Sequence, residues 1–147
     1  METIKIKKLN ENAKIPTRGS EYAAGYDLYA CLDNDYLDIP PHKTEKVSTG
    51  IALELPHKYF GAIFARSGLA AKKNLRPSNC VGICDEDYTG EYIVALHNDS
   101  DHTKTISNGE RVAQLVLLPY LSIEFEEVNE LTETKRGDGG FGSTGKA

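Results

Sequence analysis

The sequence predicts an all-β domain with one short helix and a flexible C-terminal tail. Short segments alternate apolar and polar residues with the two-residue period of a β-strand. Turn-forming residues separate these segments at intervals of roughly 8–12 residues, which is typical of a β-sandwich or barrel. Only one segment has a helical composition, and the end of the chain is rich in glycine.

Strands are expected wherever apolar and β-branched residues alternate along the chain. Residues 16–20 should form a loop, Pro40 and Pro41 should break the chain, and Gly50 should mark a bulge within a strand. The expected extended segments comprise residues 4–6, 23–30, 36–39, 46–55, 59–65, 91–96, 104–106, 111–118 and 122–128.

The single expected helix covers residues 67–75. Ser67 offers a hydroxyl as the N-cap, two alanines follow, and Lys72 and Lys73 lie near the end. Unpaired N–H groups and the positive end of the dipole would favour an anion beside Arg66 and Ser67. An ordinary capped helix would account for Ser67 but would give Arg66 no special role.

Composition predicts one structured domain followed by a tail. A chain of 147 residues can bury a core without disulfides or metal ions, and we assign residues 1–128 to this domain. Residues 129–147 contain only Leu131 and Phe141 as large apolar residues. Such a segment cannot bury enough surface to order itself, so a mobile tail is expected.

Charge and cysteine content exclude several classes of protein. The net charge of −5 leaves no basic face for a nucleic-acid backbone, and no apolar run is long enough to span a membrane. The N-terminus has neither a secretion signal nor a transit peptide. Three cysteines without a Cys-x-x-Cys pair indicate a reducing compartment. We therefore expect a cytoplasmic location, or the interior of a host cell if the protein is viral.

An acidic turn near the middle of the chain is the strongest candidate site. Apolar residues 81–84 lead into Asp85, Glu86 and Asp87, then Tyr88 follows, and a glycine turns the chain into the next strand. A turn between two strands can aim a carboxylate at a substrate. The alternative is an acidic hairpin that simply faces water.

Glycine patterns in the tail resemble two nucleotide-binding motifs, and both are rejected. Residues 137–142 match the dinucleotide fingerprint, and residues 140–146 match the start of a P-loop. Each of these motifs needs a strand before it and a helix after it, because the helix N-terminus holds the phosphate. In addition, Ala147 stands where a P-loop would place its magnesium-binding hydroxyl.

Taken together, five ordered motifs resemble the trimeric dUTPase family, the deoxyuridine triphosphate nucleotidohydrolases. Small departures are Ala65, where many members have proline, and Cys84, where an aliphatic residue is usual. The motifs are Ala-Gly-Tyr-Asp-Leu at 24–28, Arg-Ser-Gly-Leu-Ala at 66–70, Gly-x-x-Asp-x-Asp-Tyr-x-Gly at 82–90, Gly-x-Arg-x-Ala-Gln at 109–114 and Arg-Gly-x-Gly-Gly-Phe-Gly-Ser-Thr-Gly at 136–145.

This resemblance implies hydrolysis of dUTP to dUMP and pyrophosphate, which limits uracil in DNA and supplies dUMP for dTMP synthesis. Asp85 matches the general base that activates water for attack on the α-phosphorus. Tyr88 matches the ring that packs on the deoxyribose and leaves no room for a 2′-hydroxyl. Asn79, Gly82 and Ile83 match the uracil-binding segment, which rejects cytosine by leaving polar groups unpaired.

The resemblance also implies a magnesium cofactor and a closing tail. Asp27 matches an acid that positions Mg²⁺ through water, and Phe141 matches a ring that stacks on uracil. Ordering the tail over the substrate would exclude water. The other implied substrate contacts, most of them on the phosphate side, are Arg66, Ser67, Gly68, Gln114, Arg136, Gly142, Ser143 and Thr144.

The family's fold is a jelly-roll-like β-barrel, and its members form homotrimers with sites shared between subunits. Both features are expected here through the resemblance alone. Two alternatives are a dCTP deaminase-like enzyme and a non-catalytic nucleotide-binding or regulatory relative. The acidic turn and the tail fit the deaminase branch poorly, and no catalytic motif has been lost.

Overall fold

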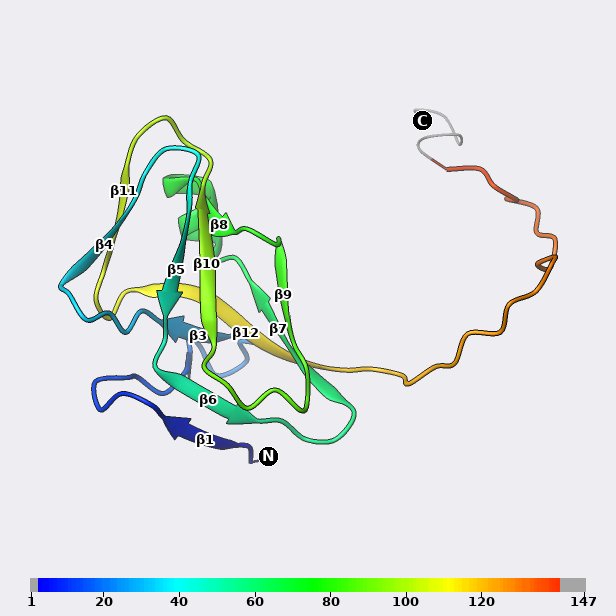
Figure 1. Ribbon diagram of the computed structural model, residues 1–147, viewed down its shortest axis with the longest axis horizontal. Coiled ribbons are helices and arrows are strands. Elements are labelled where there is room, and N and C mark those ends of the chain that lie inside the picture. The colour runs from blue at the N-terminus through cyan, green and yellow to red at the C-terminus, as the bar shows by residue number, and fades with distance from the viewer. Residues whose placement is uncertain (1–2, 141–147) are drawn as a thin grey trace.

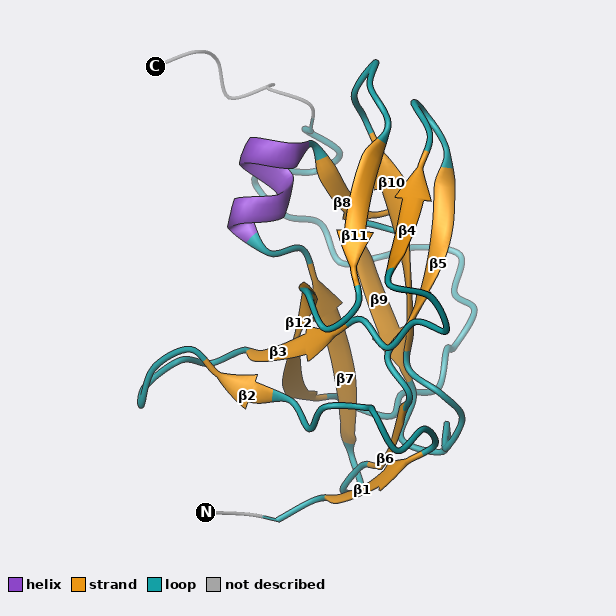
Figure 2. Ribbon diagram, turned by 90° about the vertical axis from the view of Figure 1, so that its left-hand side faces the viewer, coloured by secondary structure: helices purple, strands orange, loops and turns teal. Residues whose placement is uncertain are grey.

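The prediction of an all-β fold with one short helix is confirmed by the computed structural model, which describes residues 3–140 (Figures 1 and 2). The helical element is a π-helix, η1 (Leu69–Lys73). The strands are β1 (Lys5–Lys8), β2 (Thr17–Arg18), β3 (Tyr26–Tyr29), β4 (Tyr36–Ile39), β5 (Thr44–Ser48), β6 (Ile51–Glu54), β7 (Tyr59–Phe64), β8 (Leu75–Pro77), β9 (Val81–Cys84), β10 (Ile93–Asn98), β11 (Lys104–Ser107) and β12 (Arg111–Pro119).

The strands form antiparallel sheets around one core. The largest sheet has the order β2-β3-β12-β7-β9, and a second sheet has the order β5-β10-β8. Two-stranded sheets pair β1 with β6 and β11 with β4. Fully buried side chains from all four sheets meet in a single apolar cluster, which includes Leu28, Val47, Leu96, Ile106 and Ile51. This cluster fixes the sheets against one another and so holds the loops at their ends.

The expected helix at residues 67–75 is shorter than predicted, and Ser67 does not cap it. The N-cap is Gly68, and Asn74 ends the helix in the left-handed conformation with φ of 56°. Leu75 is fully buried and pairs with Asn98 as the first residue of β8. Burial of this leucine in a sheet therefore overrides the helical composition around it.

Residues 46–55 form two strands of different sheets, where the sequence suggested one bulged strand. β5 pairs with β10, whereas β6 pairs with β1. Gly50 lies between them with φ of +66°, and a Cβ at this position would lie 2.9 Å from the Ala13 Cβ. Glycine therefore serves a tight connection between two sheets rather than a bulge.

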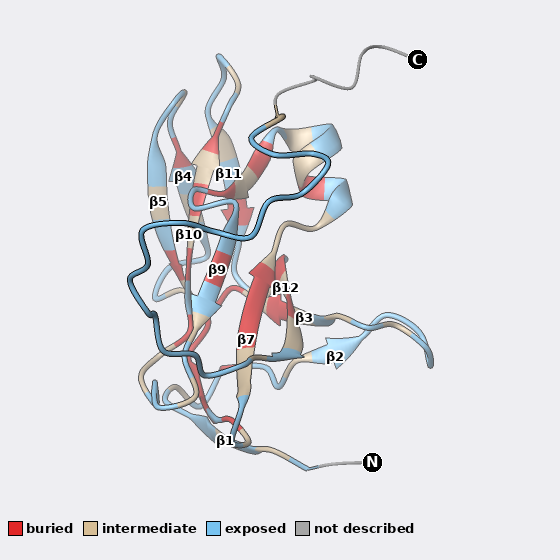
Figure 3. Ribbon diagram, turned by 90° about the vertical axis from the view of Figure 1, so that its right-hand side faces the viewer, coloured by how far each residue is buried: buried red, intermediate tan, exposed pale blue. Residues whose placement is uncertain are grey.

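The expected strand at residues 122–128 does not form. β12 ends at Pro119, and the chain then leaves the body of the protein (Figures 1 and 3). Leu121, Ile123 and Phe125 alternate as strand residues do, yet they are 85%, 65% and 93% exposed. A strand needs a hydrogen-bonded neighbour, and this segment finds none within residues 3–140. The domain boundary after Val128 stays a prediction.

One further strand arises where a loop was predicted. β2 (Thr17–Arg18) pairs with β3 at the edge of the five-stranded sheet, inside the expected loop at residues 16–20. No helix within residues 3–140 has the length and apolar character needed to cross a membrane.

Candidate active site

The acidic turn crosses from one sheet to another and does not close a hairpin. β9 pairs with β7 in the five-stranded sheet, whereas β10 lies between β5 and β8 in the three-stranded sheet. Asp85 directly follows β9, so its backbone is fixed by the pairing of Cys84 with Gly61. The Tyr88 amide donates a hydrogen bond of 3.1 Å to the Asp85 carbonyl and tightens the turn.

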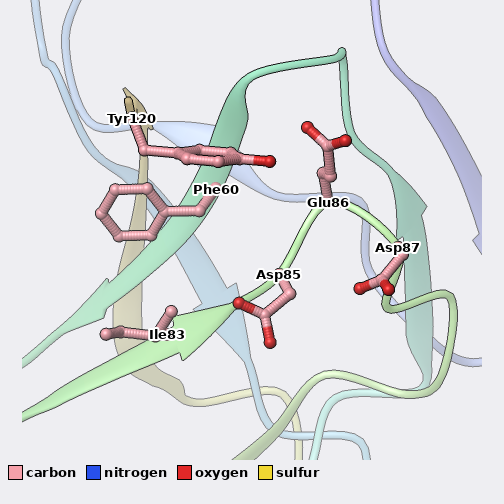
Figure 4. A pocket seen from close by; sticks show the side chains of 6 residues that line it. All are labelled: Phe60, Ile83, Asp85, Glu86, Asp87 and Tyr120. Atoms are coloured by element: carbon pink, nitrogen blue, oxygen red, sulfur yellow. The ribbon is translucent and has the colours of Figure 1, made fainter. Parts of the chain in front are cut away.

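Asp85 lines a cavity of about 550 Å³. Its carboxylate is exposed and points toward the side of the cavity where Ile83 lies (Figure 4). The rings of Phe60 and Tyr120 lie together on another wall. The cavity therefore combines an apolar wall with three carboxylates, and it is lined by Phe60, Ile83, Asp85, Glu86, Asp87 and Tyr120.

Glu86, next to Asp85, anchors the turn. Its carboxylate accepts hydrogen bonds from His57 Nδ1 at 3.0 Å and from the Lys58 amide. Hydrogen bonding with His57, then with Tyr120 and the Lys58 amide, lowers the pKa of Glu86 below its ordinary value. The Tyr120 hydroxyl faces this carboxylate (Figure 4), and the same hydrogen bond raises the pKa of Tyr120. Glu86 is thus engaged in structure, whereas Asp85 opens to the cavity.

Behind the turn, a tyrosine and a cysteine are packed against the sheet. Tyr92 is 1% exposed, and within residues 3–140 its hydroxyl has no partner at hydrogen-bonding distance. Burial is the main cause that raises the pKa of both Tyr92 and the Cys84 thiol. Because its pKa is raised, the Cys84 thiol stays protonated and packs as a small apolar group, as an aliphatic residue at this position would.

The predicted uracil-binding residues lie along β9 and the turn that precedes it. Gly82 is buried, and a Cβ there would lie 3.2 Å from the Ile63 Cβ and 3.5 Å from the Asn79 Nδ2. Asn79 thus extends along the backbone of Gly82. Ile83 is 68% exposed and lines the same cavity as Asp85. The structure therefore brings Asn79 to Gly82 and brings Ile83 to Asp85.

A second group of predicted residues surrounds Asp27, in β3. Arg66 Nε lies 2.9 Å from Asp27 Oδ1, and Arg111 Nη1 lies 3.1 Å from Asp27 Oδ2. The Asp27 side chain is only 13% exposed. The sequence placed Arg111 on a strand but gave it no role in the site, because this ion pair joins positions that are 84 residues apart.

Gln114 completes this second group. It pairs with Asp27 across β12 and β3, and its Nε2 donates a hydrogen bond of 2.9 Å to the Ala65 carbonyl. Gly25 lies against it, since a Cβ at this position would lie 2.6 Å from Gln114 Oε1. The glycine of the Ala-Gly-Tyr-Asp-Leu motif therefore makes room for the glutamine side chain. Ser67 and Gly68 follow Arg66 and are exposed.

The two groups lie at opposite ends of β7. Cys84, which precedes Asp85, is opposite Gly61, whereas Arg66 lies two residues beyond the other end of the strand. Five residues of extended chain from Gly61 to Arg66 span about 16 Å. One copy of the chain therefore does not bring Asp85 together with Arg66 or Ser67.

The tail holds the remaining predicted residues. Arg136 is exposed, and its Nε donates a hydrogen bond of 2.8 Å to the Gly139 carbonyl within a local turn. Phe141, Gly142, Ser143 and Thr144 lie outside the described residues.

A metal site made by the chain alone is not present in residues 3–140. No group of three or more His, Cys, Asp or Glu side chains there is arranged to hold an ion. Each oxygen of Asp27 accepts one guanidinium N–H, and a carboxylate oxygen can accept a second hydrogen bond. The Asp27 carboxylate therefore keeps acceptor capacity for a water molecule, which is what an outer contact to a metal ion would need.

Comparison with known proteins matches most of the chain to one family. The family model for dUTPase matches residues 11–145. The deoxyuridine 5'-triphosphate nucleotidohydrolase of Hydrogenobaculum sp. is 49% identical over 140 residues, covering 95% of this chain and 96% of the relative. The protein of the same name from Desulfitobacterium hafniense is 45% identical over 150 residues and covers 99% of both chains.

Solved structures agree with this result. The Staphylococcus bacteriophage 80alpha dUTPase with dUPNHPP has a TM-score of 0.89 at 28% identity, covering 99% of this chain and 100% of that chain. A mutant dUTPase from phage phi11, described with a structural Mg(II) ion, has a TM-score of 0.77 at 26% identity over 88% and 98% of the two chains. The jelly-roll-like fold, the motifs and the sequence identity thus lead to one conclusion: this chain belongs to the dUTPase family.

Proposed function

We propose that this chain hydrolyses dUTP to dUMP and pyrophosphate, with Asp85 as the general base. The observation that carries the proposal is the exposed Asp85 carboxylate at a cavity that Ile83 also lines. Family membership supports the reaction. The products would limit uracil in DNA and supply dUMP for dTMP synthesis. The three cysteines are free, which supports a reducing compartment such as the cytoplasm.

In the proposed reaction, a water molecule held by Asp85 attacks the α-phosphorus. The carboxylate takes the proton from the water as the new P–O bond forms. The bond between the α-phosphorus and the oxygen that bridges to the β-phosphorus breaks, and pyrophosphate leaves with that oxygen. Water and dUTP are thus converted to dUMP and pyrophosphate, and Asp85 returns its proton to solvent.

Selection of the nucleoside is assigned to β9 and to the turns before and after it. Asn79 and the backbone of Gly82 and Ile83 would pair with the uracil edge, so cytosine would leave buried polar groups unpaired. A pocket too tight for the 5-methyl would exclude thymine. The Tyr88 ring would pack on the deoxyribose and exclude a 2′-hydroxyl.

The phosphate chain is assigned to the opposite end of β7, in a second copy of the chain. Asp85 follows the residue opposite Gly61, and the chain from Gly61 to Arg66 spans about 16 Å if extended, so one copy does not place Asp85 and Arg66 on one triphosphate. We therefore propose a homotrimer in which Arg66, Ser67, Gly68 and Gln114 of one subunit face Asp85 of another. Closed symmetric assemblies are the usual form of homo-oligomers.

Asp27 would hold Mg²⁺ through water beside the phosphate chain. When bound, the ion would offset negative charge on a triphosphate that a protein of net charge −5 otherwise repels. Arg66 and Arg111 keep the Asp27 carboxylate in place, so this residue is oriented before any ion arrives.

The tail is proposed to close the site. Arg136, Ser143 and Thr144 would contact the γ-phosphate, Phe141 would stack on uracil, and Gly142 would allow close approach. Deleting residues 135–147 should lower turnover by about 100-fold, since closure excludes water and completes the site. Residues 135–138 are exposed, so the melting temperature should change little. Equal losses of activity and stability would show instead that the tail is structural.

The deciding experiment measures pyrophosphate release from dUTP, dTTP, dCTP and UTP, with and without Mg²⁺. Release from dUTP alone, dependent on Mg²⁺, is the expected result. Ammonia released from dCTP would assign the chain to deaminase chemistry. Binding of dUTP without turnover would make it a non-catalytic relative.

A further inference from the structure

The acidic turn is fastened at its far end by the side chain of Glu91. Glu91 Oε1 accepts a hydrogen bond of 2.8 Å from the Gly50 amide and a second from the Ser48 hydroxyl. Ser48 is the last residue of β5 and Gly50 lies in the connection to β6, so both donors are more than 40 residues away in sequence. This carboxylate is half-buried, so it joins two loops of the body rather than facing water.

The segment that hydrogen-bonds to Glu91, residues 48–51, is itself held firmly in place. Gly50 has φ of +66°, and its α-carbon is closely packed, with the Ala13 Cβ 2.9 Å from where a Cβ would stand. The buried Thr49 hydroxyl donates to the Tyr92 carbonyl, and the Tyr92 amide donates to the Ile51 carbonyl at 2.9 Å. Residues 91 and 92 are therefore pinned by hydrogen bonds to four consecutive residues of the body.

The same segment holds the Tyr88 ring. The Tyr88 hydroxyl donates a hydrogen bond of 2.8 Å to the Glu91 carbonyl. Its ring centroid lies 6.1 Å from that of the buried Tyr92. A Cβ at Gly90 would lie 2.7 Å from the Tyr88 ring, so the ring rests directly on the backbone. The place of this ring is thus set by residues 90–92, which are held by the Glu91 carboxylate together with the two backbone hydrogen bonds of Tyr92.

We propose that Glu91 is a positioning residue for sugar selection. Its carboxylate fixes residues 90–92, and through them it holds the Tyr88 ring where a 2′-hydroxyl would clash. The proposal rests on the proposed dUTP hydrolysis and on Tyr88 facing the deoxyribose. A side chain can exclude the 2′-hydroxyl sterically only if it is held rigidly. A Tyr88 ring that moved more freely would therefore admit the ribonucleotide.

The test compares kcat/KM for dUTP and UTP in wild-type protein, Glu91→Ala and Glu91→Gln. Loss of the clamp in Glu91→Ala should reduce the dUTP to UTP ratio by about tenfold or more, mainly through better use of UTP. Glu91→Gln should keep the ratio within about 1.5-fold of wild type, because the amide oxygen can accept the same two hydrogen bonds.

A matched control separates positioning from general stability. Glu110 is also half-buried, and it accepts hydrogen bonds from Lys73 at 2.6 Å and from the Ser107 amide at 3.0 Å. Glu110 directly precedes β12, and its carboxylate bonds to η1 and β11 rather than to the segment that holds Tyr88. Glu110→Ala should lower the melting temperature as Glu91→Ala does, and yet leave the dUTP to UTP ratio unchanged.

An active Glu91→Ala protein that keeps the wild-type ratio would overturn the proposal, as would a Glu91→Gln protein that loses the ratio as completely as the alanine variant. If Glu91→Ala does not fold, Ser48→Ala takes its place, because it removes one donor and should lower the ratio by about threefold. An unchanged ratio in Ser48→Ala would then overturn the proposal. Failure of the proposed function itself is recognised separately, since wild-type protein would release no pyrophosphate from dUTP.

Discussion

The two ends of β7 carry different charged groups. At the end that leads to the π-helix, one carboxylate lies between two guanidinium groups. At the other end of β7, three carboxylates lie together in one turn. The first group, Asp27 with Arg66 and Arg111, carries one negative and two positive charges and is therefore positive overall. The second group, residues 85–87, carries only negative charge, and Glu86 in it pairs with His57. The difference in charge supports the proposal that a phosphate chain binds at the first end and that a carboxylate at the second end acts as the base.

In the proposed reaction, neither end performs the hydrolysis alone. A carboxylate that accepts a proton must not also bind the phosphates, because like charges repel. The proposed homotrimer would avoid this conflict by placing the two functions at opposite ends of one strand and joining them across subunits. The predictions below test this difference between the two ends of β7.

Asp85→Asn should have the largest effect. An amide does not take a proton from water, so turnover should fall by about 1,000-fold or more, with nucleotide binding retained. Asp85 is exposed, so the melting temperature should stay within about 2 °C of wild type. Asp87→Asn, which changes a carboxylate on the same cavity, is the matched control and should lose less than about tenfold. A near-normal rate in Asp85→Asn would remove this residue from the base role.

Mixing two inactive variants tests whether the two ends meet across subunits. Asp85→Asn and Arg66→Gln should each have little turnover. After joint unfolding and refolding at equal amounts, the mixture should regain about one quarter of wild-type activity, because a quarter of random subunit pairs combine both intact residues. Each variant refolded alone is the control. No recovery in a mixture that forms mixed oligomers would place both residues in one chain's site.

Asp27→Asn should have a smaller effect, which is a loss in the free energy of unfolding. Two guanidinium groups lose their counter-charge beside a side chain that is only 13% exposed. Hydrogen bonds to charged groups contribute about 1.5–3 kcal/mol each, so unfolding in urea should show a loss of this order. Lys5→Gln, which breaks the exposed pair with Glu54, should change the midpoint far less. An unchanged midpoint for Asp27→Asn would mean that the ion pairs do not contribute to stability.

Glu86→Gln should have the smallest effect, and this effect should depend on pH. The folded state lowers the pKa of Glu86 below its ordinary value of 4.5, so the stabilisation is present above that pH. The variant should melt roughly 1–3 °C below wild type at pH 6, the size expected for an exposed pair. The difference should close as the pH falls below 4.5 and through the lowered pKa. A difference that stays constant across this range would exclude ionisation as its cause.

Much of the fold could be predicted from the sequence, because strand periodicity is local. β4 occupies the predicted residues 36–39, and β7 and β12 differ from prediction by one residue at one end. The errors arise where tertiary contacts override local pattern. Leu75 is helical by composition but is buried in β8, and residues 122–128 alternate correctly but have no neighbouring strand among residues 3–140.

The candidate site divides in the same way. The motifs named Asp27, Arg66, Asp85 and Gln114, because each is a chemical group at a fixed place in a short pattern. Glu91 and Arg111 were assigned no role, since their partners are more than 40 residues away and are brought near only by strand register.

The all-β class, the order of the motifs and the family can be predicted from sequence patterns, because these depend on neighbours along the chain. The assignment of β9 and β10 to different sheets, and of Asp85 and Arg66 to opposite ends of β7, required the three-dimensional structure. Register and sheet order follow from which apolar faces are buried together, and contacts throughout the core make that choice.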